Sequence, residues 1–348
     1  FPQLGLITAL RFLEWSSNNP NGVISLPTGK TPEYFIKWTH HILQNWDDKA
    51  VKKLREDNGL LINDKPSLRG LNFVQIDEFY PLNPNQHNSF YNYVCKYYID
   101  GFELDPQKAL LINSDKIPLV NGKNRKQIFP DHRIDLTLRF RDATSKVEEE
   151  QQESILLIDQ WCAEYENKIR SMGGIGFFLG GIGPDGHIAF NVRGSDHNST
   201  TRLTGTNFET QAAAATDLGG IEISRNRLVI TIGLGTITYN PDATGIIIAA
   251  GEAKSKIIKN SLEHAPDVKY PATALAKLKK SCFYITNGAG KLLADFERDY
   301  WENSEWNDQK LQRSILELSR NINVFGKKLS LDNLQNDEHC KNIPSLNA

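Results

Sequence analysis

Short runs of β-branched and other apolar residues alternate along this chain with longer amphipathic stretches. Strands of a parallel sheet are covered by helices on both faces, so they read as continuous apolar runs. The runs of this kind are Gly22–Leu26, Leu71–Ile76, Ala109–Ile112, Ile175–Leu179, Arg227–Ile232, Gly245–Ala249 and Cys282–Ile285. The helices expected between them are Thr31–Gln44, Ser89–Tyr98, Lys146–Met172 and Ala253–His264. This pattern predicts an α/β fold with three α/β/α layers, Rossmann-like, around a mainly parallel sheet.

Two regions look like additions to this core. Apolar and polar residues alternate strictly over 134–140, which predicts a half-exposed strand in a β-hairpin inserted at about 113–143. Apolar residues at helical spacing predict a C-terminal helix from Ser304, whereas the chain from Gly326 to Ala348 is polar and aperiodic and is expected to be loosely ordered. We therefore predict one α/β domain over residues 1–290 and a helical extension with a tail over 291–348.

Charge and cysteine content exclude several classes of protein. The 348 residues include 40 Lys and Arg against 42 Asp and Glu, a net charge of −2, so no overall field favours nucleic acid or an anionic membrane. No apolar run approaches the roughly 20 residues of a membrane span. The 4 cysteines are far apart and form no CxxC pair, which argues against a disulfide framework or a thiolate zinc site. A cytoplasmic protein is expected.

The first of four segments that follow predicted strands is Ser25–Pro32, with the sequence SLPTGKTP. Gly29 can adopt a positive φ, Thr28 and Thr31 supply hydroxyl groups, and Lys30 supplies a charge. The start of the next helix adds free N–H groups and a positive dipole end, which together favour phosphate. An ordinary strand–turn–helix connection capped by threonine explains the same residues equally well.

The second segment is Asp77-Glu78, directly after an apolar strand. Burial there can raise the pKa of a carboxyl group toward neutrality and produce a general base. The alternative is a solvated end of a strand with helix-capping acids.

The third segment is the most informative: GGIGPDGHIAFN, from Gly180 to Asn191. Its glycines, Gly181 among them, let the backbone approach a ligand closely. Asp185 and His187 are two residues apart, so a tight turn can direct both side chains at one substrate, and histidine exchanges protons near neutral pH. A purely structural hydrogen bond between the two is the alternative.

The fourth segment is Gly251–Lys254, again between a strand and a helix. A cation at a helix amino terminus is unfavourable unless an anion shares the site, so Lys254 indicates phosphate binding. A solvated lysine is the ordinary alternative.

These four segments, in this order, resemble the glucosamine-6-phosphate deaminase/isomerase family and its relative, 6-phosphogluconolactonase. The resemblance runs from about residue 22 to 285. It implies that SLPTGKTP is a phosphate loop, with Lys30 in place of a usual glycine, and that Lys254 holds the same phosphate. It further implies that Asp77 is the general base, that His187 assists ring opening and that Asp185 orients His187. Phe79, and the Phe190-Asn191 pair, fit the deaminases better than the lactonases.

The chain also departs from that family. Val192 stands where deaminases usually carry a ring-opening glutamate, and Thr216 aligns with an arginine that clamps the phosphate. The resemblance implies that Lys30 or Arg202 can replace the lost charge. Arg202 and Ser195 also match residues that bind an allosteric sugar phosphate in some bacterial members, although the expected lysine nearby is Thr204 here.

The resemblance predicts conversion of glucosamine 6-phosphate, or a related aminosugar phosphate, to fructose 6-phosphate and ammonia. Hydrolysis of a sugar-phosphate lactone, with His187 activating water, is the second hypothesis. A degenerate protein that binds a sugar phosphate without turnover is the third. Neither a metal nor an organic cofactor is expected. The expected partner is a small sugar phosphate, with no nucleic acid and no membrane, and a homo-oligomer stays open.

Overall fold

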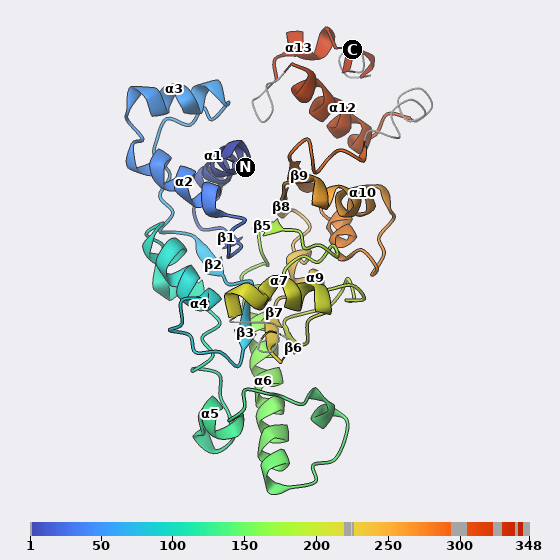
Figure 1. Ribbon diagram of the computed structural model, residues 1–348. Helices are drawn as coiled ribbons and strands as arrows, with labels where there is room; N and C mark the ends of the chain where they lie inside the picture. Colours follow the sequence, from blue (N-terminus) through green and yellow to red (C-terminus); the bar gives the residue numbers. More distant parts are fainter. Residues whose placement is uncertain are drawn as a thin grey trace.

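A central six-stranded parallel sheet carries the fold of this computed structural model, which describes residues 2–218, 224, 226–293, 305–322, 329–337 and 340–343 (Figure 1). Its strand order is β4-β2-β1-β5-β8-β9, and every pair of neighbours is parallel. The strands are β1 (Val23–Ser25), β2 (Asn72–Val74), β4 (Ala109–Leu110), β5 (Phe177–Gly181), β8 (Thr244–Ala249) and β9 (Lys280–Ile285).

A second, three-stranded sheet is antiparallel and has the order β3-β7-β6. Its strands are β3 (Asp77–Tyr80), β6 (Arg202–Thr204) and β7 (Leu228–Thr231). The apolar run at 227–232 is therefore a strand, as its composition predicts, but it pairs with β3 in this small sheet and not with the parallel one.

Helices account for most of the remaining described chain. The α-helices are α1 (Pro2–Asn18), α2 (Glu33–Gln44), α3 (Lys49–Asp57), α4 (Phe90–Val94), α5 (Arg125–Ile128), α6 (Lys146–Ser171), α7 (Phe208–Leu218), α9 (Leu234–Ile237), α10 (Ser255–Glu263), α12 (Asp308–Asn321) and α13 (Leu331–Gln335). A π-helical turn, Cys95–Asp100, continues α4, and 3-10 turns lie at Pro106–Lys108, Val120–Gly122, Leu136–Arg139, Glu252–Lys254, Pro271–Lys277 and Cys340–Asn342. None of the helices within the described ranges is long and apolar enough to cross a bilayer.

Two-sided burial of the parallel sheet produces the three layers. Consecutive strand residues point to opposite faces, so Val23 and Phe178 join one apolar cluster while Ile24 and Phe177 join another. Residues of α1 and α2 complete the cluster around Ile24, and residues of α6 and α10 complete the other. The predicted α/β/α fold with a mainly parallel sheet is confirmed.

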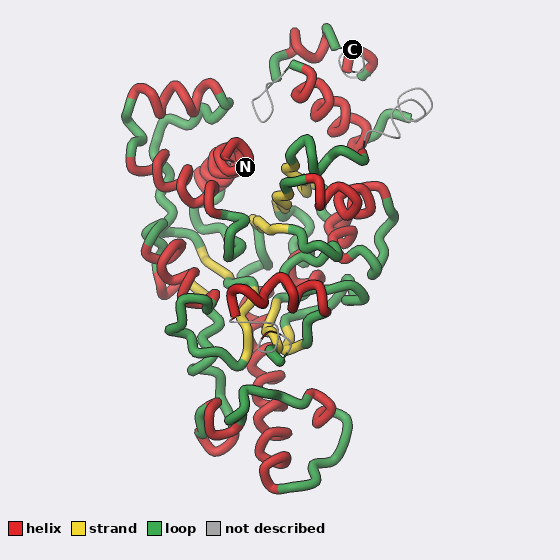
Figure 2. The backbone as a smooth tube through the Cα atoms, viewed as in Figure 1, coloured by secondary structure: helices red, strands yellow, loops and turns green. Residues whose placement is uncertain are grey.

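The insertion at 113–143 does not form the predicted β-hairpin. Its described residues contain α5 and short 3-10 turns around the amino-terminal half of α6, and no strand (Figure 2). The carboxylate of Asp135 accepts hydrogen bonds from the backbone N–H and the hydroxyl of Thr137, at 2.9 and 2.6 Å. This cap begins a 3-10 turn, so the alternating residues are wound into a turn and cannot extend as a strand.

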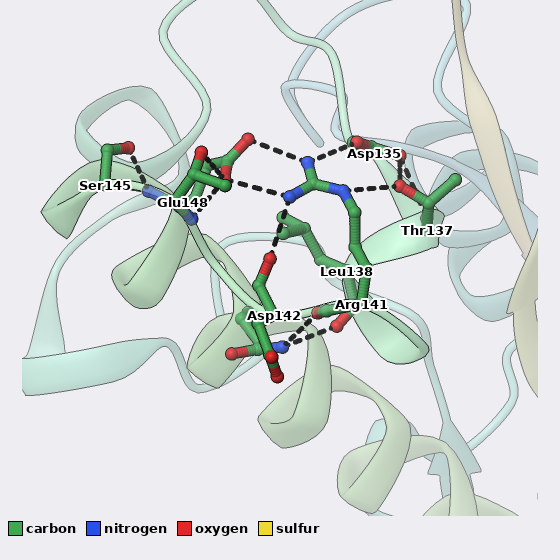
Figure 3. A network of polar contacts seen from close by, with 9 residues as sticks. Asp135, Thr137, Leu138, Arg141, Asp142, Ser145 and Glu148 are labelled. Carbon is green, nitrogen blue, oxygen red and sulfur yellow. Dashed lines mark hydrogen bonds and ion pairs between the residues drawn. The ribbon is translucent and has the colours of Figure 1, made fainter.

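Arg141 closes that turn onto α6 (Figure 3). Its guanidinium donates to Asp135 at 2.9 Å and to both carboxylate oxygens of Glu148 at 2.7 and 2.9 Å. Leu138 is buried beneath the turn, whereas Phe140 is 90% exposed. The alternation therefore matches partial burial of the apolar side chains, but the backbone forms a 3-10 turn and not a strand.

The carboxyl-terminal helices pack mainly on one another, at the opposite end of the molecule from α5 (Figure 1). Leu318 of α12 contacts Cys340 and Ile343 in a small apolar cluster of their own. The predicted helix is present as α12, whereas Ser304 lies outside the described residues. Where the expected loose tail is described, at 329–337 and 340–343, it forms α13 and a 3-10 turn.

Gly5 tests the packing of α1 on α2. A β-carbon at Gly5 would lie 2.4 Å from Tyr34 Cβ and 2.8 Å from the backbone nitrogen of Phe35. Gly5→Ala gains up to about 1 kcal/mol of helix propensity but overpacks against backbone, which costs about 1–3 kcal/mol. We expect a net decrease in the free energy of unfolding, measured by urea denaturation. Gly205→Ala is the control, since a β-carbon at Gly205 would have no atom within 4 Å; equal effects would contradict the packing argument.

Candidate active site

The carboxyl ends of β1, β5 and β8 meet at one edge of the parallel sheet. Ser25 pairs with Phe178, and Gly181 pairs with Ile248. The loops that follow these strands therefore emerge side by side, in the position where open α/β sheets bind their ligands. Thr31 contacts Gly181 directly, because a β-carbon at Gly181 would lie 3.2 Å from Thr31 Cγ2.

The loop Thr28–Thr31 is shaped from below by tyrosines. Tyr98 donates its hydroxyl to the carbonyl of Pro27 at 2.6 Å, and Tyr93 donates to the carbonyl of Gly29 at 3.0 Å. Gly29 has a φ of +83°, the left-handed region that favours glycine. Thr28 and Thr31 are half-buried, whereas Lys30 is exposed. The hydroxyl groups of Thr28 and Thr31 and the backbone of the loop thus lie ahead of α2, and phosphate binding by them stays a prediction.

Lys254 lies beside the glycine-rich loop after β5. Its ammonium group donates to the carbonyl of Ile182 at 2.7 Å, immediately before the first turn of α10. Burial lowers the pKa of Lys254, and the nearby negative charge of Asp185 opposes that shift. The structure therefore brings Lys254 to the same edge as Thr31, Gly181, Asp185 and His187.

Asp185 and His187 form a hydrogen-bonded pair. The distance from His187 Nδ1 to Asp185 Oδ1 is 2.5 Å. An ionised carboxylate only accepts, so Nδ1 carries the proton and Nε2 is the nitrogen left for a substrate. The imidazole lies against Gly183, where an added β-carbon would fall 2.1 Å from His187 Cε1. Only glycine at position 183 leaves room for this ring.

The second oxygen of Asp185 is held by Asn207, a residue that the sequence reasoning missed. Asn207 Nδ2 donates to Asp185 Oδ2 at 2.6 Å, while its Oδ1 accepts from the backbone N–H of Thr210 at 3.1 Å. Asn207 thus caps α7 and restrains the carboxylate at once. Burial opposes ionisation of Asp185, but the hydrogen bond and charge of His187 and the bond from Asn207 outweigh it and lower its pKa. The Thr210 hydroxyl lies 3.3 Å from His187 Nδ1.

Aromatic side chains form a dry wall behind the imidazole. The rings of His187 and Phe190 are stacked, with centroids 6.2 Å apart and planes inclined by 22°. Phe190 in turn contacts Phe79 and Phe90, with centroid separations of 5.2 and 6.1 Å. The wall limits the orientations of His187 and keeps water from that side of the pair.

Asp77 reaches the same region from the small antiparallel sheet. Asp77, Thr231 and Arg202 are in register on β3, β7 and β6, so their side chains share one face. That face meets the glycine-rich loop, because Thr231 Oγ1 accepts from the backbone N–H of Phe190 at 3.2 Å. The carboxyl group of Asp77 is therefore directed to the His187 side of the sheet.

Asp77 and Glu78 are both buried, with exposed fractions of 7% and 1%, so the solvated strand end that the sequence left open is not what forms. Glu78 points to the opposite face, where its carboxylate accepts from Ser89 Oγ at 2.6 Å and from the N–H groups of Phe79, Phe90 and Tyr91. Burial raises its pKa to about 7 against the effect of these bonds.

No hydrogen bond between described residues reaches the carboxyl group of Asp77. Burial, and then the neighbouring charge of Glu78, raise the pKa of Asp77 well above its ordinary value. A carboxyl group of this kind is a weak acid in a dry setting, and it is a correspondingly strong base once ionised. Asp77 is thus suited to proton transfer, whereas Glu78 anchors α4.

Arg202 lies on the face of the small sheet that also carries Asp77 and Thr231. Its hydrogen bonds, however, are not to the Thr28–Thr31 loop. Its guanidinium donates to Asn191 Oδ1 at 2.9 Å and to Ser195 Oγ at 3.3 Å. Burial lowers its pKa. The side chain of Thr216 lies outside the described residues, and Val192 is half-buried. Among the residues that the structure describes, no group of three or more His, Cys, Asp or Glu is arranged to hold a metal ion.

Curated relatives are similar to most of the chain or to part of it. No family model matches it. It is 25% identical over 289 residues to the glucosamine-6-phosphate deaminase of Borrelia garinii subsp. bavariensis, covering 81% of this chain and 86% of the relative. It is 39% identical over 136 residues to the glucosamine-6-phosphate isomerase of Candida albicans, covering 39% of this chain and 54% of that protein.

Solved structures share the fold. A monomeric glucosamine-6-phosphate deaminase superposes with a TM-score of 0.61 at 22% identity, covering 84% of this chain and 96% of that one. The 6-phosphogluconolactonase of Trypanosoma cruzi superposes with a TM-score of 0.51 at 16% identity, covering 84% of this chain and 94% of that one.

Matched substitutions of the adjacent acids should differ in their effect on stability, because Glu78 accepts several hydrogen bonds. In Glu78→Gln the amide NH₂ must face at least one N–H or O–H donor, which lowers the free energy of unfolding by about 1–3 kcal/mol. The raised pKa of Glu78 means that the loss in Glu78→Gln should shrink as pH rises toward about 7. In Asp77→Asn a costly buried charge disappears. The raised pKa of Asp77 means that its ionisation costs stability as pH rises above its unfolded value of about 4, so Asp77→Asn should be increasingly stabilising with pH. Urea denaturation across pH measures both; a pH-independent loss in Asp77→Asn would contradict the assignment.

Proposed function

We propose that this chain, which belongs to the glucosamine-6-phosphate deaminase/isomerase family, is a sugar-phosphate isomerase and deaminase that converts glucosamine 6-phosphate, or a related aminosugar phosphate, to fructose 6-phosphate and ammonia. The observation that carries the proposal is the meeting of the hydrogen-bonded Asp185–His187 pair and the Thr31–Gly181 contact at one sheet edge, opposite a buried Asp77. Relatives named for this reaction support it.

The phosphate of the substrate binds at the Thr28–Thr31 loop. Hydroxyl groups and backbone N–H groups ahead of α2 supply donors, and Lys254 supplies the positive charge that the exposed Lys30 reinforces. Gly181 lets the backbone after β5 lie close to Thr31, since an added β-carbon would lie 3.2 Å from Thr31 Cγ2. Arg202 contributes to binding on the other side, through the face that it shares with Asp77.

His187 catalyses opening of the sugar ring. With Nδ1 bonded to Asp185, the imidazole presents Nε2 to the ring oxygen and donates a proton as the C1–O5 bond breaks. Asp185 stays ionised and stabilises the positive imidazolium, because Asn207 and His187 both donate to it. Nε2, deprotonated by this transfer to the ring oxygen, then accepts the proton of the C1 hydroxyl, and C1 becomes the carbonyl carbon of the open-chain aldose.

Asp77 then moves a proton between carbons. Its carboxylate removes the proton from C2, which the neighbouring carbonyl has made acidic. The electrons form the C1–C2 double bond, and the C1 oxygen takes a proton from His187 Nε2, which gives an enolamine. The same group returns the proton to C1, giving the 2-imino form of the ketose. Water adds at C2 and ammonia leaves, so fructose 6-phosphate and ammonia are the products. These steps require only groups of the chain itself.

Lactone hydrolysis is the second candidate, and the observation that favours it is Val192. A ring-opening step lacks the carboxylate that deaminases usually carry there, whereas an Asp185–His187 pair is sufficient to activate water for attack on a lactone carbonyl. Release of a carboxylic acid from 6-phosphogluconolactone without ammonia from glucosamine 6-phosphate would replace the first proposal with this one.

We further propose that the protein is cytoplasmic. All 4 cysteines are free thiols, which suits a reducing cytoplasm. A homo-oligomer is compatible with the proposed reaction, and its existence is decided by sedimentation of the purified protein.

Asp77→Asn tests the chemistry. The neutral amide cannot accept the C2 proton, so kcat should fall on the order of 10²–10⁴-fold while the substrate still binds. The assay follows ammonia and fructose 6-phosphate, together with loss of deuterium from substrate labelled at C2. Asp64→Asn, the same change at an exposed aspartate, is the control. Unaltered turnover in Asp77→Asn would remove Asp77 from the mechanism.

Asn207→Asp tests the role of Asn207 as a positioning residue. Aspartate caps α7 as well as asparagine does, but it places a second carboxylate where Asp185 now has a donor. We expect kcat to fall on the order of tenfold to a hundredfold. The repulsion raises the pKa of Asp185, so the acid limb of the pH profile should move to higher pH. A purely structural residue would leave that limb in place.

A further inference from the structure

A group of basic and polar side chains lies between the insertion and the end of the small sheet remote from Asp77. It consists of Tyr80, Arg125, His132 and Arg227, called here the cation cluster. Arg227, just before β7, donates Nη1 to the carbonyl of Pro81 at 2.9 Å and to the carbonyl of His132 at 3.5 Å. Arg125, on α5, is bonded through Nε to Asp115 at 2.7 Å. The insertion and the sheet are thus joined here.

Three polar atoms of the cation cluster are buried without a hydrogen-bond partner among the described residues: Tyr80 OH, His132 Nδ1 and Arg227 Nε. Tyr80 is wholly buried. A buried polar group left unsatisfied costs about 1–3 kcal/mol, so such groups rarely gather without a reason. Each of the three can donate a hydrogen bond, and Arg227 Nε can only donate, so an acceptor suits all three.

Positive charge exceeds negative charge in the same place. Burial lowers the pKa of Arg227, and the charge of Arg125 lowers it further. Burial also lowers the pKa of His132, with Arg227, Arg125 and the exposed Lys126 acting in the same direction and Asp131 against them. Asp115 pairs with Arg125 but is 47% exposed, which weakens its compensation. An added anion would relieve this repulsion, whereas a water molecule would not.

The backbone at His132 is also unusual. Its φ is +56°, a left-handed conformation that costs free energy for a residue other than glycine. Such conformations persist where surrounding contacts hold them, and they concentrate at ligand-binding positions. At His132 the conformation places the residue's carbonyl on Arg227 while its ring nitrogen stays unpaired.

We propose that the cation cluster binds a tetrahedral oxyanion of the phosphate class, at a site separate from the Thr28–Thr31 loop. The anion accepts from Tyr80 OH, Arg227 Nε and His132 Nδ1, and Arg125 and Lys126 supply further charge. Since these atoms are covered, entry requires the segment 125–133 to separate locally from the sheet on the side where Arg227 and His132 are half-buried. Binding is therefore coupled to the packing of the insertion on β3.

Calorimetric titration with inorganic phosphate, against chloride at equal ionic strength, tests the proposal. The titration is made in Lys254→Gln, which weakens phosphate at the proposed catalytic loop. We expect saturable binding there that Tyr80→Phe weakens about tenfold, since it removes one bond to a charged ligand, and that Arg227→Gln weakens further. Methyl phosphate is titrated in parallel: equal binding indicates the phosphate group of a larger ligand, and binding of inorganic phosphate alone indicates the free ion.

Tyr165→Phe is the matched control, because Tyr165 is a buried tyrosine whose hydroxyl is already bonded to the carbonyls of Gln75 and Leu110. It should lower stability and leave phosphate affinity unchanged, whereas Tyr80→Phe should do the reverse. Phosphate binding that vanishes in Lys254→Gln alone, or equal affinity in Tyr80→Phe and the control, would overturn the proposal. In the unsubstituted protein, imidazole nitrogen signals of His132 that stay unmoved by phosphate would overturn it as well.

Discussion

The imidazole of His187 occupies space that every residue except glycine would fill at position 183. The rest of the site depends on this contact, because it places the ring against Asp185 and the aromatic wall of Phe190. The turn is closed by the N–H of Gly183 donating to the carbonyl of His187 at 2.9 Å. The strand β5 that precedes it is buried on both faces, so the turn begins from a fixed point. A rigid sheet thus presents a rigid turn, and the proton-transfer group needs little reorganisation.

Much of this arrangement could be predicted from the sequence, because it depends on local rules. Continuous apolar runs predicted the parallel strands, and glycine-rich loops after them marked the ligand edge. Helix α1 was missed because it is buried almost all around, so its residues lack the amphipathic period that reveals a helix. The hairpin prediction was wrong because one carboxylate, that of Asp135, captured the N–H and hydroxyl of Thr137. An alternation of apolar and polar residues predicts which side chains are buried. It does not fix the backbone, because a side-chain cap can form a turn in place of the strand.

Long-range relations were beyond sequence reasoning. Nothing local to Asp77 and Glu78 says which of them faces the loop of His187, because that depends on the pairing of β3 with β7. The role of Asn207 is of the same kind: its position before a helix suggests a cap, but its contact with Asp185, 22 residues away, needs the folded chain. Its amide donates to the oxygen of Asp185 that is not bonded to His187. The site thus orients its histidine with an amide and a carboxylate.

Strand β3 connects parts of the molecule that would otherwise be independent. Asp77 and Phe79 face the glycine-rich loop, Glu78 holds the first turn of α4, and Tyr80 belongs to the cation cluster beside the insertion. Tyr80 lies about 10 Å from Asp77 along the same strand. The pairing with β7 repeats this arrangement, because Arg227 precedes β7 and Thr231 pairs with Asp77 at its other end. The insertion is therefore joined, through the contacts of Arg227, to the two strands that hold the proposed base.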